Sequence, residues 1–161
     1  MSDGTYYGPG YRSAGINNVA SYQVSGKPYL TGALAMSGGT EMKITFPSVT
    51  SRITIKAGTH SGTVAGAPPR APLRVTFAPT GTAGVLAGQH YITLSGGNNM
   101  AVAGEYPTID MRIKCKEIFI SVPAQASPMH LQSGSFQLYA ETTGIGAQEM
   151  FDLTGPGIDE S

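Results

Sequence analysis

The sequence predicts an all-β protein, a β-sandwich or jelly-roll-like domain with an extended N-terminal arm. One indication is the strict alternation of apolar and polar residues, as in residues 73–77 and 109–115, which is typical of strands with one buried face. A second is that many such short stretches recur between turn signals, without helical periodicity. The third is the supply of turn formers, since 22 glycines and 11 prolines stand among the 161 residues.

The chain begins with a segment, residues 1–18, that has no periodicity and contains Tyr6, Tyr7 and Tyr11. A tyrosine ring offers a large apolar surface, and its hydroxyl can find a hydrogen-bond partner, so tyrosines on a structureless segment suit docking onto a neighbouring subunit. A disordered tail is the alternative. We predict an extended arm whose three tyrosines are contact residues.

Strand candidates follow the arm and make residues 19–161 a single β-sandwich domain with a C-terminal tail. Because side chains alternate between the faces of a strand, apolar residues two apart share a face, and these are the predicted core: Met42, Ile44 and Phe46; Ile53 and Ile55; Ile118, Ile120 and Val122; Phe136, Leu138 and Ala140. The predicted strands are 20–25, 29–31, 41–46, 51–57, 73–78, 90–94, 108–115, 117–122, 135–141 and 150–154.

Two segments outside the strands are further contact candidates. Residues 58–72, which include Pro68 and Pro69, form the longest stretch that no strand occupies, and long loops in compact domains usually serve contacts. The tail carries Gly155, Pro156 and Gly157. We therefore add these five residues to the predicted interface.

Charge is sparse and balanced along the chain. Ten Lys and Arg equal ten Asp and Glu, and no run of like charges occurs, so a nucleic-acid partner is not expected. Only 12% of residues are charged, compared with about 25% in typical soluble domains, which favours a protein that works within an assembly. We expect neither a signal peptide nor a membrane-spanning segment, because no apolar stretch is long enough.

No arrangement of residues typical of catalysis or metal binding is found. His60, His90 and His130 each stand without a second ligand at a chelating interval, and neither a nucleophile elbow nor a phosphate loop occurs. The lone cysteine, Cys115, falls on the apolar side of its strand, which indicates a buried, unreactive thiol and synthesis in a reducing cytosol. We expect no enzyme activity, no cofactor and no metal.

A sugar-binding module is the main competitor to a purely structural protein, because sandwiches often bind glycans with aromatic platforms and polar loops. The chain has no tryptophan, which leaves Tyr91, Tyr106 and Tyr139 as candidate platforms. Tyrosine on the polar face of a strand is more often an edge or interface residue.

Several stretches resemble small virion structural proteins of marine tailed bacteriophages, especially the T4-like phages of cyanobacteria. They are residues 19–26 with 28–32, then 114–121, then 138–141 with 153–158. The arm before residue 19 and the loop around Pro68 and Pro69 depart from that pattern.

The resemblance implies a decoration or cement protein on the capsid surface, assembled in the host cytoplasm. Its implied partners are the major capsid protein and copies of itself, as a homo-oligomer for which a trimer suits a capsid lattice. A protein of the tail, neck or fibre, and a host-glycan binding module, remain the alternatives.

Overall fold

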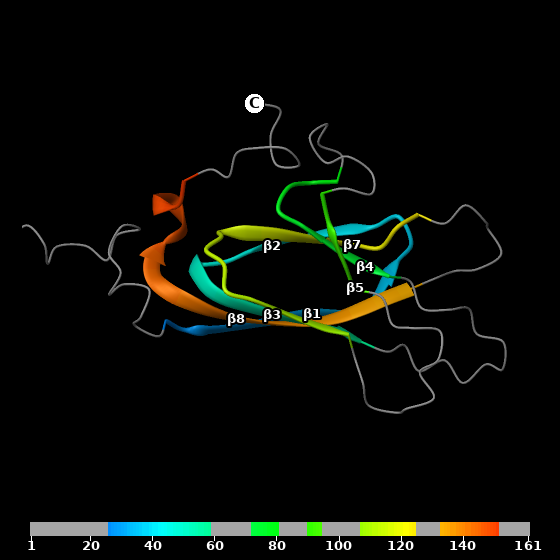
Figure 1. Ribbon diagram of the computed structural model, residues 1–161, viewed down its shortest axis with the longest axis horizontal. Coiled ribbons are helices and arrows are strands. Elements are labelled where there is room, and N and C mark those ends of the chain that lie inside the picture. Colours follow the sequence, from blue (N-terminus) through cyan, green and yellow to red (C-terminus); the bar gives the residue numbers. More distant parts are fainter. Residues whose placement is uncertain (1–25, 59–71, 81–89, 95–106, 125–132, 152–161) are drawn as a thin grey trace, which may run out of the picture.

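The computed structural model describes residues 26–58, 72–80, 90–94, 107–124 and 133–151, which form an antiparallel β-sandwich (Figure 1). The all-β sandwich predicted from the sequence is therefore confirmed, while the predicted arm lies outside the described residues. The strands are β1 (Pro28–Ser37), β2 (Glu41–Thr45), β3 (Ser48–Gly58), β4 (Leu73–Thr76), β5 (Ile92–Leu94), β6 (Thr108–Met111), β7 (Glu117–Ser121) and β8 (Ser133–Gly146), and a 3₁₀ turn, η1 (Ala147–Glu149), follows.

The strand pairing is that of a jelly roll. β1 pairs with β8, β2 with β7, β3 with β6 and β4 with β5, so the described strands nest like one long folded hairpin. Two further pairings, β3 with β8 and β4 with β7, roll this hairpin into sheet A, of order β1-β8-β3-β6, and sheet B, of order β2-β7-β4-β5. Figure 1 shows the two sheets stacked as layers. This wrapping of an eight-stranded hairpin is the jelly-roll arrangement.

The core lies between the two sheets, where the alternation in the sequence predicts it. Ile44, Phe46, Ile53, Ile55, Ile118, Ile120, Val122, Phe136, Leu138 and Ala140 are all buried, with Met42 partly buried against them. The ring of Tyr29 on β1 closes one side by meeting Phe46 edge-on, with centroids 5.3 Å apart. Large apolar side chains from both sheets thus hold the sandwich together.

Sheet B buries an aromatic side chain on its outward side. Phe119 points away from the core by strand parity, yet it is only 4% exposed. The ammonium of Lys43 lies 5.5 Å from the centroid of this ring and pairs with Glu117 at 2.7 Å. Because β2 thereby lays a charged side chain over an aromatic one, the outward side of sheet B near β2 offers little apolar surface.

Several strand boundaries differ from those predicted. β1 and β8 are longer at both ends, whereas β6 ends at Met111 rather than at Cys115. Residues 150 and 151 are not a strand, because η1 turns the chain and the Met150 amide donates to the Ala147 carbonyl. The predicted strand 20–25 and residues 152–154 lie outside the described part of the chain.

The end of β6 has a specific cause, a buried polar contact with β3. The Thr50 hydroxyl donates to the Ile113 carbonyl at 2.9 Å and accepts from the Cys115 amide at 3.1 Å. The Thr50 amide in turn donates to the Cys115 carbonyl at 3.1 Å. A side chain thus replaces part of the strand ladder, and the Ile113 carbonyl and both Cys115 backbone groups keep partners where the chain leaves sheet A toward β7.

The Cys115 thiol is expected to react slowly in the folded protein. It is fully buried, and burial raises its pKa from an ordinary 9.0 to about 11, against the opposing hydrogen bond with Thr50. A thiol reagent at pH 8 should therefore label the native chain at least about a hundredfold more slowly than the urea-unfolded chain, because only the thiolate reacts. Equal rates would contradict the burial.

The same pKa difference fixes a stability trend with pH. Because the folded state favours the neutral thiol, its contribution to stability is full below about pH 9 and is lost as the pH rises from about 9 to about 11. As the pH rises through this range, the urea midpoint of the intact chain should fall further than that of Cys115→Ala.

Candidate interaction face

The outward side of sheet A carries several exposed side chains, among them Leu30, Leu34 and Tyr139. On β8 the residues Phe136, Leu138 and Ala140 point into the core, so the alternate residues point outward. Strand register then aligns them into rows across all four strands, one of Leu30, Tyr139, Thr54 and Asp110, and the next of Gly32, Gln137, Lys56 and Thr108. We call this surface the sheet A face.

The β1 side of this face is apolar and exposed. Leu30 is 74% exposed and Leu34 is 90% exposed, and Tyr139, the register partner of Leu30, is 37% exposed. None of the ten residues of β1 carries a charge. Leucines left in water at such exposure cost hydrophobic free energy that a partner could recover.

Edge strands differ sharply within the sandwich. β1 has ten residues, whereas the edge strands β2, β6 and β5 have five, four and three. β2 carries charged Glu41 and Lys43, and β6 carries Asp110. Natural sheets protect their edges by shortness and by charge, and β1 has neither, although it does carry a bulge between Ala33 and Met36. β1 is therefore the edge best suited to accept another strand.

The opposite side of the sheet A face is charged. Arg52 binds Asp110 through two hydrogen bonds of 2.8 Å and lies 3.5 Å from Glu141, while the Thr54 hydroxyl donates to Asp110 at 3.0 Å. The hydrogen bond from Arg52 holds the pKa of Asp110 below its usual value. This network is exposed, so it fixes the orientation of side chains more than it stabilises the fold.

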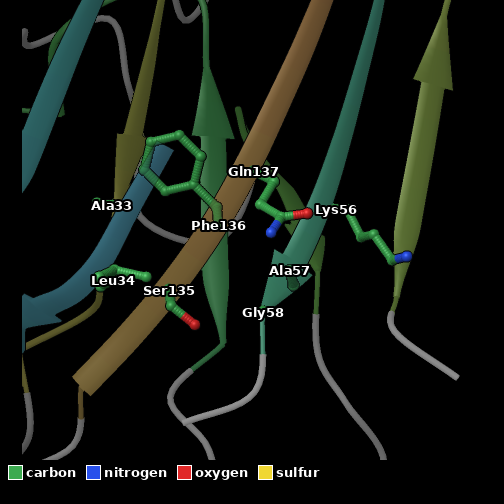
Figure 2. A pocket seen from close by; sticks show the side chains of 8 residues that line it. All are labelled: Ala33, Leu34, Lys56, Ala57, Gly58, Ser135, Phe136 and Gln137. Atoms are coloured by element: carbon green, nitrogen blue, oxygen red, sulfur yellow. The ribbon is translucent and has the colours of Figure 1, made fainter. Parts of the chain in front are cut away.

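A hollow of about 360 Å³ opens on this face beside Leu34, near the end of β1. Its eight lining residues come from β1, β3 and β8 (Figure 2). Ser135 is 8% exposed, and its hydroxyl oxygen is buried with no hydrogen-bond partner among the described residues. Figure 2 shows Lys56 extending from β3 away from Ser135. We call this cavity the Ser135 hollow.

Gly58 is what leaves room beside this hydroxyl. It pairs with Ser135 in the register, and a Cβ at position 58 would lie 2.5 Å from the Ser135 oxygen. With glycine there, the outward-facing apolar side chain that lines the hollow is Leu34, and its polar groups include the Ser135 hydroxyl and the Gln137 amide. Such a cavity suits a small group with an apolar body and one hydroxyl.

The structure does not describe the residues that the sequence predicts as interface. Tyr6, Tyr7, Tyr11, Pro68, Pro69, Gly155, Pro156 and Gly157 are all outside the described residues. Leu30, Leu34 and Ser135 were missed, although an uncharged ten-residue run from Pro28 to Ser37 is visible in the sequence and was the available signal.

The tyrosines considered as sugar platforms have different surroundings. Tyr139 is central on the sheet A face, between Leu30 and Thr54. One face of the Tyr91 ring is occupied by the Arg74 guanidinium, 4.2 Å from the centroid. Tyr106 lies outside the described residues. Of the two described candidates, Tyr139 is the one that shares a surface with the hollow.

Among the residues the structure describes, no three His, Cys, Asp or Glu side chains gather in a way that could hold a metal ion. No helix within these same segments is long and apolar enough to cross a membrane. Comparison with family models, curated proteins and solved structures gives no match to this chain.

Proposed function

We propose that this chain is a virion structural protein that decorates the outer surface of a capsid and cements neighbouring shell subunits. The observation that carries the proposal is the sheet A face, where a long uncharged edge strand exposes Leu30 and Leu34. A chain that stayed alone in solution would gain nothing from such an edge, whereas an assembly protein buries it.

Three further features support a structural role. The fold is a jelly roll, an architecture used in viral capsid and lectin domains. Charge is only 12% of the residues, which suits a protein surrounded by other protein. The segment resemblances to virion proteins of marine tailed phages point the same way.

A cement protein stabilises a shell by mass action, since each copy buries surface at one of many symmetry-related positions and binds only the assembled state. The partners in this proposal are the major capsid protein and further copies of the chain, at the virion surface. Assembly would take place in the host cytoplasm.

A host-glycan binding module is the second candidate, and one observation favours it. Tyr139 is partly exposed in the middle of the sheet A face, with Gln137 and Thr54 beside it. A ring flanked by polar side chains can stack on a sugar and hydrogen-bond its hydroxyls. In that case Tyr139→Ala would remove binding to bacterial glycans.

The test of the cement role is the copy number of the chain in purified particles of the phage that encodes it. Quantitative mass spectrometry against the major shell protein should give a ratio near one or another simple lattice fraction. A few to a few dozen copies would instead place the chain in the tail, neck or fibre. Complete absence from particles would reject the structural role and leave the glycan-binding candidate.

A further inference from the structure

We infer that the sheet A face is the acceptor for the N-terminal arm of a second copy of this chain, with β1 pairing with the arm and the Ser135 hollow receiving one of its tyrosine side chains. The inference rests on the proposed function and deepens it, because it names the contact that would link one copy to the next.

The chemistry of the hollow matches a tyrosine side chain. Leu34 gives it an apolar wall, and the Ser135 hydroxyl is a buried group with no partner among the described residues. Leaving such a group unpaired is costly, and a phenol hydroxyl can both donate to it and accept from it. At about 360 Å³ the hollow is at the small end of the range for ligand pockets, roughly 300–1,000 Å³, so it suits a single ring.

The edge beside the hollow provides main-chain partners for an incoming segment. β1 is the last strand of sheet A, so its outward N–H and C=O groups are not used by the sheet order. An extended segment that pairs with β1 would satisfy them, and its alternate side chains would reach over Leu30 and Leu34. Affinity would then come from the backbone, and selectivity from the hollow.

The two described residues before β1 run beside β8 and away from the Leu34 end of the open edge. The Thr142 hydroxyl donates to the Lys27 carbonyl, and Gly26 lies directly against the backbone of Thr142. Gly26 and Lys27 thus still follow β8, and they do so at the opposite end of β1 from Leu34. The described chain leaves the sandwich along the strand axis and does not turn back along the open edge of β1.

The length of the preceding segment fits this arrangement. Twenty-five residues precede Gly26, and Tyr11 lies fifteen positions before it. Fifteen extended residues span about 50 Å, whereas the ten residues of β1 span about 33 Å. A segment of this length that continues outward passes beyond its own sheet and can reach the face of a neighbouring copy.

The test is a complementation experiment with full-length chains, followed by sedimentation velocity in the absence of particles. Leu34→Lys places a charge on the apolar part of the sheet A face and should weaken self-association about thirtyfold. Replacing Tyr6, Tyr7 and Tyr11 together by serine spoils the arm and should weaken it at least as much. A mixture of the two chains retains one intact arm and one intact face, and association should return. Thr45→Lys, which adds a lysine to the exposed edge strand β2, is the matched control and should change nothing.

The tyrosine that enters the hollow is identified by a double-mutant cycle. Ser135→Ala should weaken association about fivefold, as the loss of one hydrogen bond does. Tyr→Phe at the matching arm position should cost the same alone and nothing further in the Ser135→Ala chain. Additive effects at all three tyrosines would overturn the assignment of the hollow.

Other outcomes overturn the inference as a whole. These are a monomeric full-length chain at about 100 μM, a Leu34→Lys chain that associates like Thr45→Lys, or a mixture that fails to associate. Because the assay contains no particles, its failure is separate from failure of the cement role. Occupied capsids with a monomeric free chain would reject only the inference, and association without occupancy would reject only the cement role.

Discussion

A chain without residues 2–18 is expected to bind its particle at least about a hundredfold more weakly than the intact chain, while its sandwich remains folded. Loss of two buried tyrosine contacts at about 2 kcal/mol each is sufficient for this factor. Arms that link copies would also make occupancy at one site depend on the neighbouring copies, which increases the loss. The measurement is the occupancy of particles that lack the chain after addition of either protein at equal concentrations.

The fold should survive the deletion because the described residues form a continuous core between the two sheets. Within the described part of the chain, its buried apolar residues run from Met36 to Ile145, and Tyr29 is the first described residue that packs against them. Equal urea midpoints for the two chains would establish that lost binding is not lost folding. Two full-length controls separate the rings from the length of the arm, since Tyr→Phe at positions 6, 7 and 11 keeps the apolar area and Tyr→Ser removes it. Unchanged occupancy by a folded deletion chain would contradict the role of the arm.

The sequence predicts the inward face of most strands because burial imposes a period of two. Ile53, Ile118 and Phe136 follow that rule and are buried as expected. The rule fails where a residue on the outward face of a sheet is covered by another side chain. Phe119 has outward parity, but Lys43 from β2 covers it, and such a contact depends on strand pairing rather than on local pattern.

The lengths of β1 and β8 were underestimated for a related reason. β8 continues past Glu141 through Thr142 and Thr143, two adjacent buried polar residues that break the alternation. Their hydroxyls are satisfied by the carbonyls of Lys27 and Val49, on segments about a hundred positions away. A pair of threonines whose hydrogen-bond partners lie far away in the sequence therefore predicts a loop or a solvent-exposed strand face.

The Ser135 hollow could not be predicted at all. It arises because Gly58 at the end of β3 meets Ser135 at the start of β8, and nothing in either local sequence marks that register. The uncharged edge, by contrast, is local, since Pro28–Ser37 can be recognised in the sequence as a run without charge. The sequence thus indicates an uncharged strand, whereas the strand pairing determines which residues lie beside it.

The second large effect is expected at Thr50. Its buried hydroxyl on β3 hydrogen-bonds the backbone of Ile113 and Cys115, in the segment that connects β6 to β7. Thr50→Val keeps the shape of the side chain and removes its hydrogen bonds, so the buried Cys115 amide loses its acceptor and the Ile113 carbonyl its donor. Each orphaned group costs roughly 1–3 kcal/mol, and we expect a loss of about 3 kcal/mol in the free energy of unfolding. Urea denaturation followed by circular dichroism measures it.

Thr50→Ser is the matched variant, because it keeps the hydroxyl and deletes the methyl group, at a cost of about 1 kcal/mol. A larger loss for valine than for serine assigns the effect to hydrogen bonding, whereas the reverse order would assign it to packing. Thr45→Val, at an exposed position of β2, should be nearly neutral. The valine variant should also label faster at Cys115, because residues 112–115 carry the chain from sheet A to β7 and Thr50 is the side chain that holds them against β3.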